Sequence, residues 1–532
     1  MNKELPGSIG SIMSQAVRNA YRQNSEDETM EPLVLMDTNK QPVGRIRKND
    51  AVIFYNIRGE REIELTRSLT EKGFHSFEPV KDLSLTFATM IEYQKGLDVQ
   101  VAYPPEGEVL DTLSDILARH HFKQAKITEA EKAVHVTYFL NGKKEQPLPE
   151  EERIIVPTRK DVHLFDEAPE MSIEKISQAI IDKINDPSCQ FIFANFPNVD
   201  VVGHIENEKA IIKAVEAVDR YTGRVLDEAG KQNLTVMVTA DHGTVEKWLY
   251  PDGAVDTGHT DSPVPFILIH DTPGLQLRPD GALTDIAPTV LQLLRLPVPA
   301  LMTGQSLIAH PVPEQIQQAQ RLLLLILDGW GESTQIQGNL IAQAATPTMD
   351  SLKNSYPWTT LKAAGEAVGL PAGTVGNSEA GHLHIGAGRQ IFADRVRINR
   401  AIADGTFCEN EAFLNVMRRA KQQEKALHLI GIVSFFSSHG SINHLFALMD
   451  LAKRENIPEV YIHAMLGRRG EMPESGALYV EKIERKAAEI QKGTVVSVIG
   501  RYWSMDREEN WDRIKKTYDM LVFGKGRPVF PD

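Results

Sequence analysis

The sequence has few of the features that mark exported or membrane proteins. Among its 532 residues there are only two cysteines, Cys189 and Cys408, which lie far apart and offer no disulfide framework. No stretch approaches the roughly 20 apolar residues of a membrane span. The first residues, MNKELPGSIGSIMSQ, lack the apolar core of a signal peptide. We therefore expect a cytoplasmic protein.

An excess of positive charge is also missing. Lys and Arg number 58 against 72 Asp and Glu, which gives a formal net charge of −14 at pH 7. Phosphate backbones and anionic lipid surfaces select basic faces, so this balance argues against nucleic-acid and membrane partners. An anionic small-molecule substrate would need a local basic pocket instead.

The chain is rich, by contrast, in short apolar runs that alternate with helical patterns. Such alternation is typical of α/β proteins, in which mainly parallel sheets are flanked by helices. Helical periodicity is clearest over 208–229 and recurs over 9–20. A chain of this length is expected to form two or three domains. The runs that predict strands are 51–57, 191–196, 234–240, 265–270, 322–327, 427–433 and 460–466.

Metal-ligating residue types follow several of these strands. The stretch NVDVVGH places Asp200 and His204 four residues apart, so both can reach one ion if the intervening backbone is helical. Asp241 and His242 come directly after the strand predicted at 234–240. They therefore lie at a carboxyl end, where open α/β sheets hold their ligands.

Three further stretches add to this pattern. DTGHT contains His259, LILDG places Asp328 at another strand end, and the glycine-rich segment 373–389 presents Ser378 at a predicted sharp turn. Mixtures of carboxylate and imidazole suit divalent ions such as Mn²⁺ or Zn²⁺. Two such ions at a separation of ~3.5–4 Å stabilise the attacking and leaving oxygens in phosphoryl transfer.

Each stretch also has a simpler interpretation. Asp-x-x-x-His can be a solvated or hydrogen-bonded pair, and Asp-His-Gly can be a helix N-cap followed by a turn. Gly-Asn-Ser-Glu can be a capped turn, since Asn and Ser favour such positions without any nucleophilic role. We favour a metal site because all five stretches place a ligand-type residue where a strand ends or a glycine turns the chain.

Five stretches of the chain form long, specific motifs: LILDGWG, GEAVGLPAGTVGNSEAGHLHIGAGR (365–389), NFPNVDVVGH, TADHG and GRYWSMDREENWDR (500–513). These motifs closely resemble those of one family, the cofactor-independent phosphoglycerate mutases of the alkaline phosphatase superfamily. The resemblance covers nearly the whole chain, but its order is rotated. The family's second half comes first, at about residues 1–310, and its first half follows at about 321–525, so the chain resembles a circular permutant.

The resemblance implies two α/β domains, each with a mainly parallel sheet flanked by helices. An alkaline-phosphatase-like metal domain would be continuous over 105–392, with the proline-containing connector 310–320 joining the family's old termini. A transferase domain would be split between 1–104 and 393–532. Permutation is tolerated when the old termini lie near each other and the new ones lie at the surface.

The resemblance also implies the chemistry. Ser378 would be the nucleophile that takes the phosphoryl group from phosphoglycerate, and the net reaction would interconvert 3- and 2-phosphoglycerate in a monomeric enzyme. Two divalent ions are implied, with Mn²⁺ favoured and Zn²⁺ or Mg²⁺ as alternatives. Their ligands would be Asp200, His204 and His259 for one ion, and Asp328, Ser378, Asp241 and His242 for the other.

Basic residues are implied on the substrate side. A guanidinium fork matches phosphate and carboxylate oxygens with two parallel hydrogen bonds, so arginines are expected there. The residues that match the family's substrate-binding positions are Arg58, Arg61, Lys132, His439, Arg469, Arg501 and Arg507.

Several family side chains are replaced in the glycerate-handling part. The position of the expected acid/base on the glycerate hydroxyls is Gly470, and such a group contributes typically ~10²–10⁴-fold. Smaller changes are Glu60 for Asp and Thr244 for Asn. The remaining replacements, which remove two acids and a histidine, are Phe435, Gly467 and Ser441.

Three functions therefore stay open. The first is a permuted phosphoglycerate mutase, favoured because every metal ligand and the basic substrate residues are present. The second is a metal-dependent phosphomonoesterase that has lost the transfer step, which Phe435 and Gly470 keep open. The third is a non-catalytic relative, against which the intact metal ligands argue.

Overall fold

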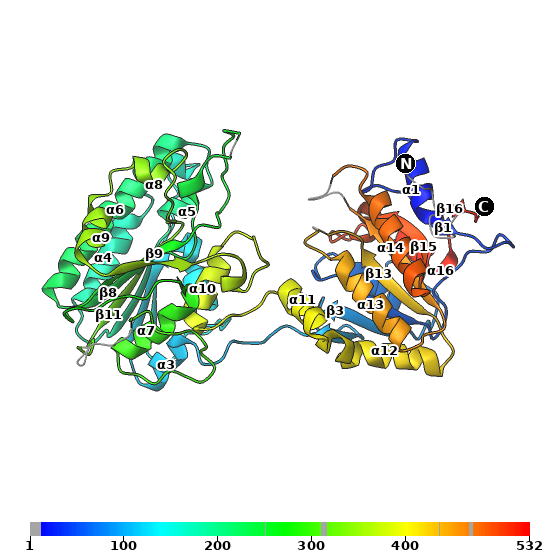
Figure 1. Cartoon of the computed structure of the whole chain (residues 1–532), viewed down its shortest axis with the longest axis horizontal. Helices are drawn as coiled ribbons and strands as arrows, with labels where there is room; N and C mark the ends of the chain where they lie inside the picture. The colour runs from blue at the N-terminus through cyan, green and yellow to red at the C-terminus, as the bar shows by residue number, and fades with distance from the viewer. Residues whose placement is uncertain (1–11, 251, 310–316, 436, 468–471, 532) are drawn as a thin grey trace, which may run out of the picture. The chain divides into compact units, whose positions relative to one another are not determined.

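The structure, a computed structural model, describes residues 12–250, 252–309, 317–435, 437–467 and 472–531. The chain divides into two compact units (Figure 1). Unit 1 comprises Met1–Pro105 and Asp394–Asp532, and unit 2 comprises Glu106–Ala393. Most of the predicted connector, residues 310–316, lies outside the described residues. Across the described ranges, no helix is long and apolar enough to cross a membrane.

Unit 1 contains one eight-stranded sheet, ordered β16-β1-β15-β14-β13-β2-β3-β4. Its strands pair in parallel except β1 with β15. The two chain segments of the unit meet where Ala51 of β2 pairs with Leu427 of β13. The strands are β1 (Leu33–Leu35), β2 (Ala51–Phe54), β3 (Thr86–Ile91), β4 (Gln100–Tyr103), β13 (Leu427–Ile432), β14 (Val460–Leu466), β15 (Thr494–Gly500) and β16 (Arg527–Val529).

Helices cover this sheet with their apolar faces. For example, Phe413, Val416 and Met417 of α12 are buried in the same hydrophobic core as the strands. The helices are α1 (Ile12–Tyr21), α2 (Ile63–Thr70), α11 (Asp394–Asp404), α12 (Glu411–Gln422), α13 (Ile442–Arg454), α14 (Gly476–Ile490), α15 (Arg501–Ser504) and α16 (Trp511–Phe523), with the short turn η7 (Thr406–Glu409).

Unit 2 contains the second eight-stranded sheet, ordered β10-β12-β9-β8-β11-β7-β5-β6. The run β8-β11-β7-β5-β6 is parallel, whereas β9 is antiparallel to both of its neighbours. The central β11 is fully buried, as its unbroken apolar run predicts. The strands are β5 (Gln124–Glu129), β6 (Glu151–Val156), β7 (Phe191–Phe196), β8 (Thr235–Thr239), β9 (Val264–Ile269), β10 (Gly281–Ala282), β11 (Leu322–Leu327) and β12 (Trp358–Lys362).

Helices flank both faces of this sheet. Figure 1 shows α4, α6 and α9 on one face and α3, α7 and α10 on the other. The helices are α3 (Leu113–Arg119), α4 (Ile173–Ile184), α5 (Asn198–Gly203), α6 (Glu208–Lys231), α7 (Ile286–Leu293), α8 (Leu340–Gln343), α9 (Pro347–Ser355) and α10 (Ser378–Ala387). Short 3-10 helices are η1 (Ala130–Lys132), η3 (Phe165–Glu167), η4 (Val245–Lys247), η5 (Leu283–Asp285) and η6 (Gly365–Val368), and η2 (His135–Phe139) is a short π-helix.

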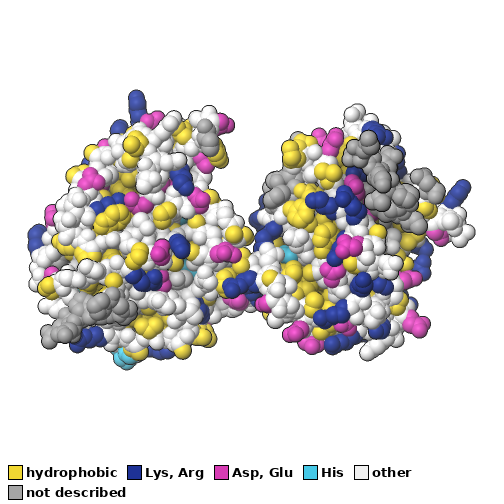
Figure 2. Space-filling model, in the orientation of Figure 1, with side chains coloured by type: hydrophobic (Ala, Val, Ile, Leu, Met, Phe, Trp, Pro, Cys, Tyr) yellow, Lys and Arg dark blue, Asp and Glu magenta, His cyan; other side chains and the backbone are white. Residues whose placement is uncertain are grey.

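The predicted fold class is confirmed, since each unit has a mainly parallel sheet flanked by helices. All seven predicted strands are present, within a few residues at each end. The helix predicted over 208–229 is α6, and its apolar stripe, which includes Ile211, Val215 and Val218, is buried. The face shown in Figure 2 carries interspersed acidic and basic side chains.

A buried polar chain crosses the sheet of unit 1. His428 Nε2 lies 3.2 Å from Asp50 Oδ2, and His428 Nδ1 lies 2.9 Å from His463 Nε2. His463 Nδ1 in turn lies 2.7 Å from Ser497 Oγ. Because the carboxylate only accepts, two uncharged rings and a donating serine hydroxyl satisfy every link. Burial, together with neighbouring His428, lowers the pKa of His463 well below its ordinary value.

This row of hydrogen-bonded groups makes the stability of unit 1 depend on pH. An unfolded histidine binds a proton as the pH falls below about 6.5, whereas buried His463 does not, so acid favours the unfolded state by up to about 1.4 kcal/mol per pH unit. Urea unfolding between pH 7.5 and 5 should show this loss of stability. His463→Gln should make it shallower, whereas substitution of the exposed His75, as His75→Gln, should not. Equal pH slopes for the protein and for His463→Gln would contradict this assignment.

Candidate functional site

The carboxyl ends of neighbouring parallel strands in unit 2 bring together side chains that are distant in the sequence. Strands β8, β11 and β7 are adjacent, with Ile326 paired to Thr239 and Leu327 paired to Phe196. Asp328 therefore follows β11 at the same edge where the chain leaves β8 and β7. Asp241 follows β8, Asp200 lies in α5 after β7, and Lys132 ends η1 after β5.

Ser378 reaches this edge from the start of a helix. It is the first residue of α10, and the preceding Asn377 caps the helix because its side chain accepts a hydrogen bond from the Ala380 N–H. The simpler interpretation of a capped turn is therefore correct for Asn377. The same turn places Ser378 Oγ 3.0 Å from His242 Nε2 and 2.5 Å from Lys132 Nζ.

Two histidines face Asp200 through the same ring nitrogen. His204 Nε2 and His259 Nε2 lie 3.3 and 3.0 Å from Asp200 Oδ1, and 3.2 Å from each other. Their opposite nitrogens are held by backbone carbonyls, since His204 Nδ1 lies 2.7 Å from Thr257 O and His259 Nδ1 lies 2.9 Å from Gly376 O. A carbonyl only accepts, so each Nδ1 donates, which leaves each Nε2 to give its lone pair to a metal ion bound beside the carboxylate.

His242 has the same arrangement at the centre of the cluster. Its Nδ1 lies 3.1 Å from the Gly243 carbonyl, so Nε2 faces the cluster, 3.5 Å from Asp328 Oδ1 and 3.6 Å from Asp200 Oδ1. Burial by itself lowers the pKa of His242, but the carboxylates of Asp241, Asp328 and Asp200 outweigh it and raise the pKa to about 10. The three carboxylates therefore stabilise positive charge at this nitrogen, whether a proton or a bound metal cation carries it.

Lys132 balances only part of the negative charge. Its Nζ donates to Asp200 Oδ2 and Asp328 Oδ1, each at 2.7 Å. Burial alone lowers the pKa of Lys132, but the surrounding carboxylates outweigh it and hold the pKa above its ordinary value, so the ammonium stays charged. Asp241 Oδ2 is buried and accepts no hydrogen bond from any described residue.

These observations fit divalent metal ions. Three buried carboxylates exceed the single ammonium in charge, three imidazole lone pairs converge on them, and one carboxylate oxygen has no hydrogen-bond partner. All seven predicted ligand residues lie in this one cluster. Among the described residues, the two groups whose ligand atoms lie within 4.8 Å of one another are Asp200, His242 and His259, and Asp241, Asp328 and His382.

Three residues of this region were not predicted. His382 follows Ser378 by four residues, a helical spacing that could have indicated its place beside the nucleophile. Asn195 is a polar residue inside an apolar strand, which is only a weak signal. Glu246 is buried and accepts hydrogen bonds from the Thr244 N–H, at 2.9 Å, and from the Thr260 hydroxyl, which ties together the loops on either side of the cluster.

In unit 1, strand ends also collect predicted residues. Glu60, just after β2, contacts two arginines, because Arg58 and Arg507 each lie 3.2 Å from its Oε1. The nearby Arg61 donates to the Met505 carbonyl at 3.1 Å. The replacement of Asp by Glu at position 60 thus leaves an acid that holds both guanidinium groups.

The remaining substrate candidates of unit 1 occupy neighbouring strand ends. His439 follows β13, and its Nδ1 lies 3.2 Å from Glu62 Oε1. Arg501 begins α15 directly after β15 and is buried. Arg469 and Gly470 lie outside the described residues.

The other replaced positions are built into the packing of unit 1. The Phe435 ring packs against Tyr479 at a centroid distance of 5.6 Å, with Lys482 Nζ 4.5 Å from the Phe435 ring centroid. Ser441 caps α13 by accepting from the Asn443 N–H. At Gly467 a Cβ atom would lie 2.7 Å from Arg501 Cδ, so an aspartate there would require Arg501 to move.

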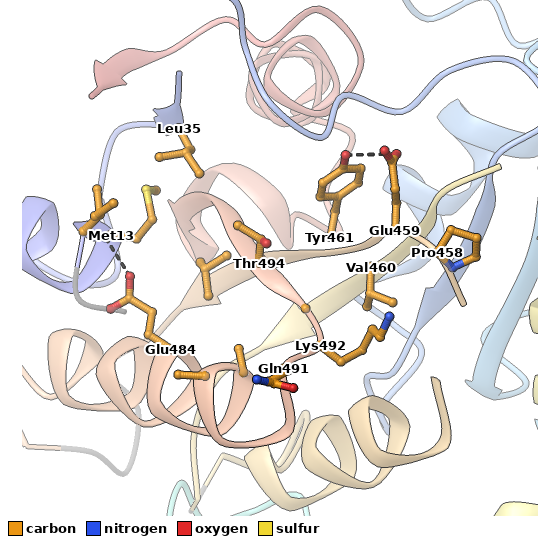
Figure 3. A pocket seen from close by; sticks show the side chains of 15 residues that line it. Met13, Leu35, Pro458, Glu459, Val460, Tyr461, Glu484, Gln491, Lys492 and Thr494 are labelled. Carbon is orange, nitrogen blue, oxygen red and sulfur yellow. Dashed lines mark hydrogen bonds between the residues drawn. The ribbon is translucent and has the colours of Figure 1, made fainter. Parts of the chain in front are cut away.

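One cavity of the structure adjoins the cluster in unit 2, whereas another lies away from the predicted substrate residues of unit 1. One of about 710 Å³ in unit 2 is lined by His259 together with Lys247, Tyr250 and Ile336, so it adjoins the cluster. Another of about 560 Å³ lies in unit 1, at the amino ends of β14 and β15, the opposite edge of the sheet from the arginines (Figure 3). Three of its polar side chains have partners within the chain: Tyr461 bonds Glu459, Glu484 accepts from the Met13 N–H, and Lys492 donates to the Ile457 carbonyl.

Ion binding should stabilise unit 2 measurably. We expect protein dialysed against a chelator to unfold at a higher temperature once Mn²⁺ is added. At a free Mn²⁺ concentration of 100 times the dissociation constant, the free energy of unfolding should rise by about 2.7 kcal/mol. Asp241→Asn should remove most of this gain, because it removes charge at the unpartnered oxygen.

Buried Asp219 provides a matched control. Its carboxylate accepts from the Thr348 and Met349 N–H groups at the start of α9 and lies outside the cluster. Asp219→Asn should lower the unfolding temperature and leave the gain on adding Mn²⁺ unchanged. If the unsubstituted protein showed no gain, the metal assignment would be wrong.

Comparisons with known proteins agree with the resemblance of the motifs. A family model described as the Metalloenzyme superfamily matches residues 14–298, more than half of the chain. A second model, described as the N-terminus of BPG-independent PGAM, matches residues 398–530, near the carboxyl-terminal end of this chain.

Two similar relatives carry the name 2,3-bisphosphoglycerate-independent phosphoglycerate mutase. The protein of Moorella thermoacetica is 38% identical over 304 residues, 57% of this chain and 58% of the relative. That of Myxococcus xanthus is 47% identical over 214 residues, 40% of this chain and 42% of the relative. The chain thus spans little more than half the length of the curated relatives it matches.

Among solved structures, a phosphoglycerate mutase of Leishmania mexicana, described at low cobalt concentration, is 30% identical. The match covers 52% of this chain and 53% of that chain, with a TM-score of 0.37. The Metalloenzyme model spans more than half of this chain and includes five of the seven predicted ligands, namely Asp200, His204, Asp241, His242 and His259. The chain therefore belongs to the Metalloenzyme superfamily.

Proposed function

We propose that this protein interconverts 3-phosphoglycerate and 2-phosphoglycerate through a phosphoserine at Ser378. The observation that carries this proposal is the convergence of three carboxylates and three imidazole Nε2 atoms around one serine hydroxyl. Ser378 Oγ lies 3.0 Å from His242 Nε2 and 3.4 Å from Asp328 Oδ1. The names of the similar relatives support phosphoglycerate as the substrate.

Two divalent ions would be held at this cluster, with Mn²⁺ as the proposed metal. When bound, they would stabilise the Ser378 oxygen as an alkoxide and offset the negative charge of the phosphoryl group during its transfer. The carboxylates and imidazoles described above fit this role, and Ser378 completes the second set. The proposed ligands are Asp200, His204 and His259 for one ion, and Asp241, His242, Asp328 and Ser378 for the other.

Residues of unit 2 would do the rest of the phosphoryl transfer. Ser378 Oγ attacks phosphorus, the bond from phosphorus to the glycerate oxygen breaks, and the serine proton ends on the freed hydroxyl. In the return step the neighbouring glycerate hydroxyl attacks the phosphoserine phosphorus, the bond from phosphorus to Ser378 Oγ breaks, and the hydroxyl proton ends on Ser378 Oγ. Lys132, charged and 2.5 Å from Ser378 Oγ, would bind the phosphoryl oxygens. The N–H groups at the start of α10 favour the same anion.

Unit 1 would bind the glycerate part of the substrate. Guanidinium forks suit its carboxylate, and the Glu60 carboxylate keeps two of them, Arg58 and Arg507, near each other. Arg61, Arg501 and His439 occupy neighbouring strand ends, and Arg469 is proposed from the family motif alone.

We also propose that the chain order is rotated relative to the family. Unit 2 would be the alkaline-phosphatase-like domain, predicted over 105–392, and unit 1 the split transferase domain. The match of a model described as an N-terminus to residues 398–530 supports this order, as does the discontinuous composition of unit 1. A cytoplasmic location is part of the proposal, because both cysteines are free thiols.

The reaction is tested by a paired assay on 3-phosphoglycerate with Mn²⁺. An enolase couple follows 2-phosphoglycerate while free phosphate is measured in parallel. We expect 2-phosphoglycerate to form, and Ser378→Ala to lower its rate by on the order of 10³-fold or more, because the variant lacks the hydroxyl that takes the phosphoryl group.

Ser177→Ala is the matched control, since this buried serine in α4 has an unbonded hydroxyl and lies outside the cluster. It should keep the full rate. Free phosphate without 2-phosphoglycerate would show a phosphomonoesterase that has lost its transfer step. Activity in neither channel would favour a non-catalytic relative, and either result would overturn the mutase proposal.

The arginine assignment has a separate test. Arg507→Lys keeps the charge but loses the two-pronged fork, so we expect the KM for 3-phosphoglycerate to rise about tenfold with a smaller effect on kcat. Arg513→Lys serves as the control, because Arg513 instead lies 4.1 Å from the Tyr502 ring centroid and contacts Asp506. A KM equal in both variants would argue against substrate binding by Arg507.

A further inference from the structure

Two buried side chains lie directly behind the carboxylates of the cluster. Asn195 belongs to β7 and His382 to α10, and both are shielded from solvent. Asn195 Nδ2 donates to Asp328 Oδ2 at 2.7 Å and lies 3.2 Å from His382 Nε2. His382 Nδ1 lies 3.0 Å from the Ser378 carbonyl and 3.2 Å from Asp241 Oδ2. The pair therefore connects two carboxylates and the backbone of the nucleophile.

Hydrogen-bond chemistry allows one assignment of protons in this pair. An amide nitrogen only donates, so His382 Nε2 accepts from Asn195, and a carbonyl only accepts, so His382 Nδ1 donates to Ser378. Both hydrogens of the Asn195 amide are then used, one on Asp328 and one on His382. With Nδ1 donating and Nε2 accepting, His382 has no lone pair left for a metal ion, although it lies among the ligand atoms.

The surroundings hold this ring in place. Its centroid lies 5.8 Å from that of Phe193 and 5.9 Å from that of His135. The preceding Gly381 lets α10 approach the end of β8, since a Cβ atom there would lie 2.7 Å from the Asp241 carbonyl oxygen. The distance between His382 and Asp241 is thus set by close packing of the backbone.

We propose that His382 and Asn195 are positioning residues for one of the two ions. They hold Asp328 by its Oδ2 atom, so that Oδ1 faces Lys132 and Ser378, and the His382 ring packs beside Asp241, with Nδ1 3.2 Å from Asp241 Oδ2. The ion at Asp241, Asp328 and Ser378 depends on this support. The ion at Asp200, His204 and His259 does not, because the carbonyls of Thr257 and Gly376 orient its histidines. This role rests on the proposed function and adds residues to it.

The test counts Mn²⁺ ions on the full-length protein by electron paramagnetic resonance titration, with calorimetry for the affinities. His382→Phe keeps an aromatic ring beside Phe193 but removes both nitrogens. We expect one of two ions to bind about 10–100-fold more weakly in this variant, as for other residues that orient metal ligands, while the other keeps its affinity. His382→Gln, which retains a donor and an acceptor, should recover part of the loss.

Asn195→Ala provides an independent variant at the other end of the pair and should weaken the same single ion. His384→Gln is the matched control, since His384 is also buried on α10 but bonds only the Ala380 carbonyl and the Ile391 N–H. It should bind two ions as the unsubstituted protein does. Circular dichroism melting identifies any variant that fails to fold. If His382→Phe does not fold, the Mn²⁺ titration of Asn195→Ala tests the positioning role instead.

The possible outcomes separate the two proposals. If the unsubstituted protein binds two ions, and both the His382→Phe and Asn195→Ala variants bind them unchanged, the positioning role is overturned and the proposed function stands. Equal weakening of both ions would also overturn it, because a general structural effect would then explain the loss. If the unsubstituted protein binds fewer than two ions, the proposed function and this inference both fail.

Discussion

The concentration of negative charge at one edge of the sheet in unit 2 is the constraint on which the rest of the site depends. Asp200, Asp241 and Asp328 are buried together, and burying a charge is costly unless it is paired. Lys132 offsets one of the three charges through two ion pairs of 2.7 Å. The remaining charge makes the edge a strong site for divalent cations and accounts for the raised pKa of His242.

Backbone carbonyls orient the histidine rings so that their Nε2 atoms face this concentration of charge. Each of the three histidines contacts a backbone carbonyl through Nδ1: His242 that of the adjacent Gly243, His204 that of Thr257, and His259 that of Gly376. The Gly376 carbonyl belongs to the turn that leads into α10, so orientation of His259 and presentation of Ser378 come from one short segment. A change in that turn would alter a ligand and the nucleophile together.

The order of the chain matters little to either sheet. In unit 1, Ala51 pairs with Leu427, and in unit 2, Leu322 pairs with Thr235 and Phe191. Contacts of this kind are already distant in the sequence, so joining old termini and opening new ones leaves the strand neighbours unchanged. The proposed rotation is therefore compatible with an intact cluster, whose members follow β5, β7, β8 and β11, begin α10 in the case of Ser378, or lie in the loop before β9 in the case of His259.

Local sequence determined the strands and the residues at their ends. The run Leu322–Leu327 is apolar throughout, so it could only be a buried segment, and Asp328 and Ser378 lie in motifs specific enough to indicate their chemistry. Tertiary structure alone decided the partners. Asn195 and His382 meet Asp328 and Asp241 across strands and a helix that are far apart in the chain, and the side chain of Arg501 lies against Gly467. No local pattern encodes such contacts, because they arise from the alignment of parallel strand ends and the close packing of α10, which only the folded sheet creates.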